Sequence, residues 1–188
     1  MGTATMKQET NTYTHRLGEV FTYEDKEYSE IQLDFGTLTG KDGLDIEQEM
    51  QAEGIGFLRN EAFDGGYQLI TAAKASGIAK DVLLALPLRD CAALKREAQR
   101  YLVNGNSTLA NEMGDKLRTL TGDTLQIIDN ELRAERHLVI NGAALDTWYC
   151  LKLAAKAAEV PEDQILGLPL NEFLNVKMAV RYFLMGLG

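Results

Sequence analysis

The sequence has only two cysteines and two histidines among its 188 residues. Two cysteines are too few for a disulfide framework. Neither His15 nor His137 has another histidine or a cysteine at the spacing that zinc ligands require. Cys91 falls on the apolar face of a predicted helix, where a small buried side chain is a simpler interpretation than a nucleophile. We therefore expect no catalytic residue, no metal and no cofactor.

Basic residues are also scarce, with 19 Lys and Arg against 28 Asp and Glu and a formal net charge of −9. Nucleic-acid binding needs a basic patch that displaces counterions, so this composition argues against a nucleic-acid partner. No apolar run approaches the roughly 20 residues that cross a bilayer. The N-terminal stretch is polar and lacks the apolar core of a signal peptide. We expect a cytoplasmic protein without a membrane partner.

The strongest positive signal is an internal duplication with a period of 82 residues and no gap. Three short motifs recur at that spacing. They are Leu38-Thr39-Gly40 with Leu120-Thr121-Gly122, Ala72-Ala73-Lys74-Ala75 with Ala154-Ala155-Lys156-Ala157, and Leu86-Pro87-Leu88 with Leu168-Pro169-Leu170. The chain therefore consists of two tandem copies of one unit, which we call the first and the second copy.

The pattern predicts a mainly α protein with a small N-terminal β-hairpin, an α+β chain of two tandem three-helix units. We expect a flexible tail over residues 1–15, the hairpin and first helical unit over 16–104, a linker over 105–115 and the second unit over 116–188. The linker is placed where small polar residues gather after Gly105. Alternation over residues 20–23 and 28–35 predicts the two strands, with Ser29, Ile31, Leu33 and Phe35 facing inward. Only the first copy has this hairpin.

The third helix of each copy has the clearest periodicity. In the first copy its apolar positions are Cys91, Leu94, Ala98 and Tyr101, and in the second they are Phe173, Val176, Val180 and Phe183. Such a stripe is typical of an intramolecular core, and it is also compatible with a partner-binding or self-association surface. The bulkier stripe of the second copy is the better candidate for such a surface.

Charged residues at two kinds of helical position are candidate binding residues. Lys74 and Lys156 stand at equivalent places in alanine-rich helices, where they either cover apolar surface with their stems or offer a charge to an acidic partner or to the other copy. Asp90 lies in the first turn of its predicted helix, where the helix dipole favours a carboxylate.

The order of these motifs resembles the tail assembly chaperones of tailed phages and prophages. The resemblance covers about residues 16–104 and includes Leu38-Thr39-Gly40 followed by Asp42, the run 72–77, Leu86-Pro87-Leu88 followed by Asp90, and Tyr101 near the end. The second copy departs from it at Thr124, which replaces the acid at position 42, and at Ala158-Glu159, which replace Ser76-Gly77.

The resemblance implies a protein without catalysis that binds the tape-measure protein, helps tail-tube subunits to assemble around it, and is absent from the finished virion. It implies action in the host-cell cytoplasm. Two alternatives stay open: a structural tail or connector component retained in the virion, and a helical adaptor or regulator that acts on a host protein.

Overall fold

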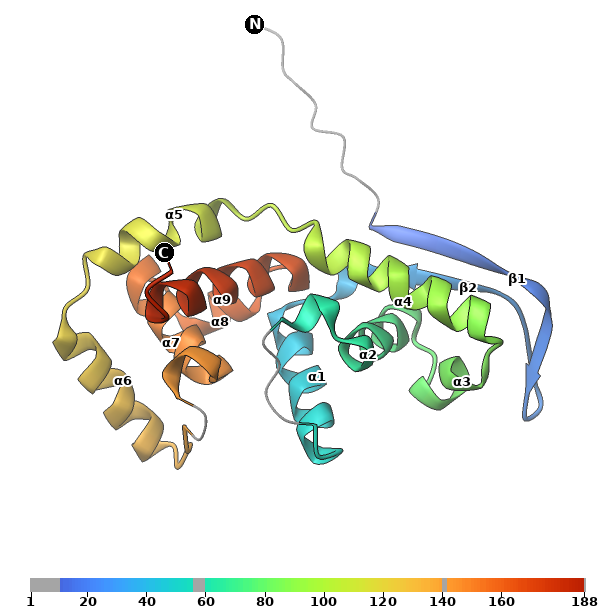
Figure 1. Cartoon of the computed structure of the whole chain (residues 1–188), viewed down its shortest axis with the longest axis horizontal. Coiled ribbons are helices and arrows are strands. Elements are labelled where there is room, and N and C mark those ends of the chain that lie inside the picture. The colour runs from blue at the N-terminus through green and yellow to red at the C-terminus, as the bar shows by residue number, and fades with distance from the viewer. Residues whose placement is uncertain (1–10, 56–59, 140–141, 188) are drawn as a thin grey trace, which may run out of the picture.

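The computed structural model describes residues 11–55, 60–139 and 142–187. In that part of the chain it contains nine α-helices and one two-stranded antiparallel sheet, which confirms the mainly α fold with a small hairpin. The molecule is elongated, with the hairpin at one end and helix α6 at the other (Figure 1). No helix of the described residues is long and apolar enough to cross a bilayer.

From α1 and from α6 onward, both copies have the same succession of helices. The first copy contains β1 (Thr12–Tyr23), β2 (Lys26–Asp34), the 3-10 turns η1 (Phe35–Thr37) and η2 (Glu61–Phe63), and α1 (Gly40–Ala52), α2 (Gly65–Ser76), α3 (Lys80–Ala85) and α4 (Leu88–Val103). The second contains α5 (Thr108–Arg118), α6 (Gly122–Ala134), η3 (Ala143–Leu145), α7 (Thr147–Ala158), α8 (Glu162–Leu166) and α9 (Leu170–Leu184). From α1 onward each element of the first copy begins 82 residues before its counterpart, as the duplication requires. The three predicted helices of each copy are present; the short α3 and α8 are additional, and so is α5 at the start of the second copy.

The hairpin is longer than the sequence pattern indicated. Strand β1 begins at Thr12, so residues 12–15 belong to the sheet and not to the predicted flexible tail, whose residues 1–10 lie outside the described part. Register is irregular between Arg16 and Phe21. As a result Tyr28 is buried in place of the predicted Ser29, whereas Ile31, Leu33 and Phe35 face inward as expected.

The predicted linker over residues 105–115 is wrong for most of its length, because helix α5 begins at Thr108. Ser107 caps this helix by accepting a hydrogen bond from the Ala110 N–H at 3.2 Å. Met113 and Leu117, one turn apart, are buried where α5 packs on α7 and α9. They stand 82 residues after Ile31 and Phe35 of the hairpin segment, which packs on α2 and α4. The second copy thus covers the corresponding face with a helix.

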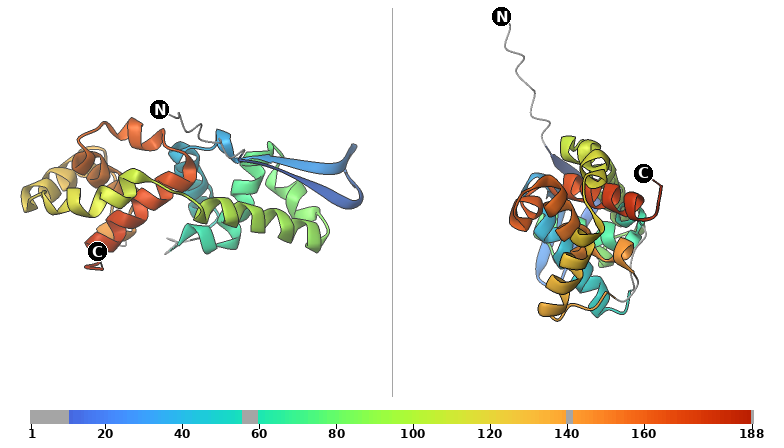
Figure 2. Two further views of the ribbon diagram at one scale, coloured as in Figure 1. Left: turned by 90° about the horizontal axis from the view of Figure 1, so that it is seen from above. Right: turned by 90° about the vertical axis from the view of Figure 1, so that its left-hand side faces the viewer.

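One hydrophobic core extends through both copies. Helix α1 of the first copy packs on α2 of its own copy and also on α9 of the second, so the two copies share an interface (Figures 1 and 2). This interface brings residues more than 100 positions apart in the chain into contact.

Candidate functional site

The interface between the copies is built from two of the repeated motifs. Leu38-Thr39-Gly40, which leads into α1, lies antiparallel to Leu168-Pro169-Leu170, which leads into α9. The Gly40 N–H donates to the Leu168 carbonyl and the Leu170 N–H donates to the Leu38 carbonyl, both at 3.0 Å. A motif of the first copy therefore pairs with a different motif of the second.

Two glycines let α1 approach α9 closely. A Cβ on Gly40 would stand 2.8 Å from the Phe173 ring, and one on Gly43 would stand 2.8 Å from Leu170 Cδ1. These distances are shorter than van der Waals contact, so any larger residue would push the helices apart.

Replacing Gly40 by alanine should therefore lower the free energy of unfolding by about 1–3 kcal/mol, because the added methyl group overpacks the interface. The equivalent Gly122→Ala is the matched control: its Cβ would meet nothing within 4 Å, and we expect no loss. Urea denaturation followed by circular dichroism measures both. Equal losses in the two variants would contradict the close approach at Gly40.

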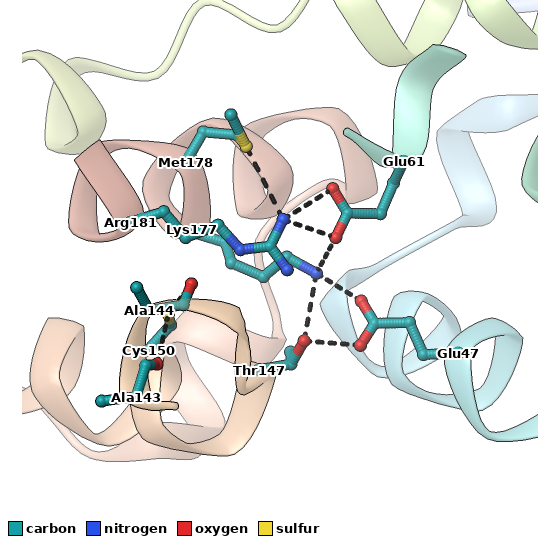
Figure 3. A network of polar contacts seen from close by, with 9 residues as sticks. All are labelled: Glu47, Glu61, Ala143, Ala144, Thr147, Cys150, Lys177, Met178 and Arg181. Atoms are coloured by element: carbon teal, nitrogen blue, oxygen red, sulfur yellow. Dashed lines mark hydrogen bonds and ion pairs between the residues drawn. The ribbon is translucent and has the colours of Figure 1, made fainter. Parts of the chain in front are cut away.

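A buried ionic cluster lies beside this motif pair (Figure 3). Lys177 of α9 contacts the carboxylates of Glu47 and Glu61, with 2.6 Å to Glu61 Oε1. Arg181, one turn later, pairs with Glu61 at 2.8 Å. Thr147 of α7 accepts from Lys177 Nζ at 3.1 Å and donates to Glu47 Oε2 at 2.5 Å. Two acids of the first copy are thus bound by two bases of the second.

Burial makes this cluster important for stability. Glu61, Lys177 and Arg181 are each only 2% exposed. Burial by itself raises the pKa of Glu61, but the charges of Lys177 and Arg181 outweigh it, and the pKa lies below its ordinary value. Glu61 is therefore a carboxylate at neutral pH, and its charge is needed to neutralise the two cations.

Sequence reasoning did not find this cluster. The duplication gave a partial indication of it, because both copies keep a lysine at positions 95 and 177 and an acid at positions 47 and 129. The partner Glu61 has no such signal, since the second copy has Ala143 at that position.

The two candidate lysines each form an ion pair inside their own copy. Lys74 of α2 lies 3.8 Å from Asp42 of α1, and Lys156 of α7 lies 2.7 Å from Glu131 of α6. They connect equivalent helix pairs, so neither bridges the two copies. Asp42 also accepts a hydrogen bond from the Thr39 N–H at 2.9 Å, which caps α1.

The remaining candidates of the first copy pack against the hairpin segment. Asp90 Oδ1 accepts a hydrogen bond from His15 Nε2 of β1 at 2.8 Å. The Tyr101 ring stacks on Phe35 with 4.7 Å between ring centroids, and burial raises the pKa of Tyr101 to about 12. Both residues hold α4 against the segment that precedes α1.

The stripe on α9 is core and not a binding surface. Phe173, Val176 and Val180 are buried, and Phe183 is partly buried against the same core. Of the two interpretations left open by the sequence, the structure supports the intramolecular one. A partner could reach the three buried side chains only by unfolding the helix.

The described residues contain no group of three or more His, Cys, Asp or Glu side chains that could hold a metal ion. Cys150 is buried beside the carbonyls of Ala143 and Ala144, and burial raises its thiol pKa to about 11. A thiol with such a pKa is protonated at neutral pH and is a poor nucleophile.

The outer side of α9 has a different stripe, which the sequence analysis missed. Met178, Tyr182 and Met185 follow one another at spacings of four and three residues, and Tyr182 and Met185 are exposed. Met178 and Tyr182 also line a shallow groove of about 350 Å³ between α9 and the start of α5, together with Ala110, Asn175 and the small polar segment 105–107. Large apolar side chains beside a groove are typical of a surface that binds an amphipathic helix.

Comparisons with protein-family models, with curated proteins and with solved structures found no match.

Proposed function

We propose that this protein is a tail assembly chaperone that binds a helical segment of the tape-measure protein and does not catalyse a reaction. The observation that carries the proposal from the structure is the stripe of half-buried Met178 and exposed Tyr182 and Met185, of which Met178 and Tyr182 line the groove between α9 and the start of α5. The choice of partner rests on the resemblance of the repeated motifs to tail assembly chaperones.

The chemistry of the stripe suits this partner. A long helical tape-measure chain exposes apolar stripes until tail-tube subunits cover it, and such surfaces aggregate. Methionine side chains are flexible and polarizable, so they adapt to successive segments of differing sequence. The net charge of −9 would keep the complex soluble in the host cytoplasm until tube assembly replaces the chaperone.

Co-expression with the cognate tape-measure protein, followed by affinity purification and a solubility assay, tests the proposal. We expect the two chains to co-purify and the tape-measure protein to become soluble. The double variant Tyr182→Glu/Met185→Glu should bind at least about tenfold more weakly, because two charges would be buried against an apolar helix.

Val103→Glu is the matched control. Val103 occupies in α4 the place of Met185 in α9, and the two are 45% and 46% exposed. We expect this variant to bind as the unmodified protein does. Absence of association by a folded chain would contradict the tape-measure role. Recovery of the protein in purified virions would instead indicate a structural tail component.

A further inference from the structure

The outer stripe of α9 changes its chemistry halfway along the helix. Its C-terminal half consists of Met178, Tyr182 and Met185. The same line continues towards the start of the helix through Asn175 and Asn171, at spacings of three and four residues. Residues at these spacings lie on one face of a helix. The stripe therefore presents apolar side chains at one end and amides at the other.

These two amides belong to a larger group around the connection between α4 and α5. Six of the nine asparagines of the chain line two cavities that flank this connection, which is a concentration that asparagines scattered over a surface would not show. Asn11, Asn104 and Asn171 line a cavity of about 480 Å³, and Asn106, Asn111 and Asn175 line the groove of about 350 Å³ described above. We call these six residues the asparagine belt.

The two cavities are neighbours because the connection lies directly on α9 near its start (Figures 1 and 2). A Cβ on Gly105 would stand 2.5 Å from the carbonyl oxygen of Asn171, so only a residue without a side chain fits at this contact. Asn175 Nδ2 donates to the Gly105 carbonyl at 2.6 Å. The next residues on either side, Asn104 and Asn106, each line one of the two cavities.

The asparagine belt suits a ligand whose backbone groups are free. Each asparagine side chain has two N–H donors and one carbonyl acceptor, which are the hydrogen-bonding groups of a peptide bond. The four members of the belt that lie outside α9 are exposed, so their amides can be reached. In a helix the backbone N–H and C=O groups already bond to each other, whereas in an extended segment they are free. The belt therefore fits an extended peptide better than a helix.

The belt is also uncharged, although the chain has a net charge of −9. Of the described residues that line the two cavities, only Glu97 and Arg100 are charged, and they pair with each other at 2.7 Å. A charged side chain of a ligand would lose water here without gaining an unpaired opposite charge. The peptide that fits this surface is therefore uncharged.

We propose that the asparagine belt binds an uncharged, extended peptide segment through its backbone. The inference rests on the proposed function, in which a helix of the tape-measure protein lies on Met178, Tyr182 and Met185. The occupant of the belt is the stretch of the same partner chain next to that helix. The bound segment is thus helical over the apolar half of the stripe and extended over the amide half. Because backbone groups are the same in every sequence, the belt can hold successive segments that differ in their side chains.

Fluorescence anisotropy with the full chain and overlapping, end-capped peptides of the cognate tape-measure protein tests the inference. Each bound helical peptide is compared with versions that are extended at one end. We expect extension at one of the two ends to tighten binding at least about tenfold, the effect of roughly two or three added hydrogen bonds. The increase should persist when salt is raised from about 0.1 to about 1 M, which shortens the screening length from about 10 to about 3 Å.

Chemical changes in the added residues distinguish recognition of the backbone from recognition of side chains. Methylation of their backbone nitrogens removes the N–H donors and should abolish the increase in affinity. Replacement of their side chains by alanine should leave the increase unchanged. The opposite pattern would show that the belt reads side chains and would overturn the inference.

Variants of the chain locate the contact. Asn104→Ala/Asn111→Ala removes one exposed amide from each cavity, so it should abolish the effect of the extension and leave the affinity for the shorter peptide unchanged. Asn130→Ala, at an exposed position of α6 outside both cavities, is the matched control and should keep the effect.

The possible failures can be told apart. Peptides that bind through Tyr182 and Met185, but gain nothing from extension or bind Asn104→Ala/Asn111→Ala just as tightly, would overturn this inference alone. An effect of extension that disappears at high salt would also overturn it, because the contact would then be between charges. If no tape-measure peptide binds the folded chain, the proposed function fails and the inference fails with it.

Discussion

Replacing Glu61 by alanine is expected to lower the free energy of unfolding by about 3–5 kcal/mol, the loss that follows when one partner of a buried ion pair is removed. Glu61 is 2% exposed and contacts both Lys177 and Arg181. Its removal leaves Arg181 without an acidic partner in a site that water does not reach, and leaves Lys177 with Glu47 alone. Urea denaturation followed by circular dichroism measures the loss.

Two further variants show whether the loss of stability comes from leaving a buried cation unpaired or simply from removing a carboxylate. Glu61→Ala/Arg181→Gln creates the residue pair of the equivalent positions 143 and 99, and it should recover part of the loss because no unpaired cation stays buried. Glu49→Ala removes an exposed partner of Lys80 and should cost less than about 1 kcal/mol. A Glu61→Ala loss no greater than that of Glu49→Ala would contradict the structural role of the cluster.

The contribution of Glu61 also depends on pH, with a sign that follows from its pKa. The pKa in the folded protein lies below the ordinary value of 4.5, since the attraction of Lys177 and Arg181 outweighs burial, which alone would raise it. Its stabilising contribution is therefore complete above the unfolded-state pKa and is lost as pH falls through the folded-state pKa. The difference in stability between the unmodified chain and Glu61→Ala should be constant near neutrality and should shrink below about pH 4.5.

The parts of the fold that the sequence predicted are those with local periodicity or exact repetition. The 82-residue period located equivalent helices, and the spacing of three and four residues identified the core face of α4 and α9. Alternation in residues 28–35 identified strand β2. Each of these signals comes from residues that are close in the chain, so no knowledge of tertiary contacts was needed.

The errors have tertiary causes. Small polar residues after Gly105 indicated a linker, although Leu109, Met113 and Leu117 have a helical spacing that marks α5. Strand β1 was predicted too short because its N-terminal half has few large apolar residues and is held by pairing with β2. Pairing across more than 100 residues, as between Glu61 and Arg181, leaves no local pattern at all.

The candidate site could likewise be predicted only in part, because its contacts join residues that are far apart in the chain. Its motif residues Leu38 and Gly40 do come together with a repeated motif, but with Leu168 and Leu170 of the other copy. The sequence showed which residues were repeated, and only the structure showed that unlike motifs pair. The interpretation of Phe173 as a binding residue was wrong because its side chain fills the space that Gly40 and Gly43 leave in that pairing.

Phe173→Ala should accordingly lower the free energy of unfolding by about 3–5 kcal/mol, the usual cost of removing a buried phenyl group and leaving a cavity. Phe173 is 1% exposed and lies between α1 and the core of the second copy. Cys91→Ala is the matched control at the equivalent position of α4, where the partly exposed side chain is small, and we expect a loss below about 1 kcal/mol. Denaturation in urea measures both.

Combining this change with Gly40→Ala shows whether the two residues are in contact. The alanine methyl group at position 40 overlaps the Phe173 ring, so removal of the ring also removes the overlap. The double variant should be more stable than the sum of the two single losses predicts, by at least about 0.5 kcal/mol, as is usual for residues in direct contact. Strict additivity would mean that the ring does not press on α1. The loss caused by Gly40→Ala would then come from overlap with Leu166, whose Cα lies 3.1 Å from the same Cβ position.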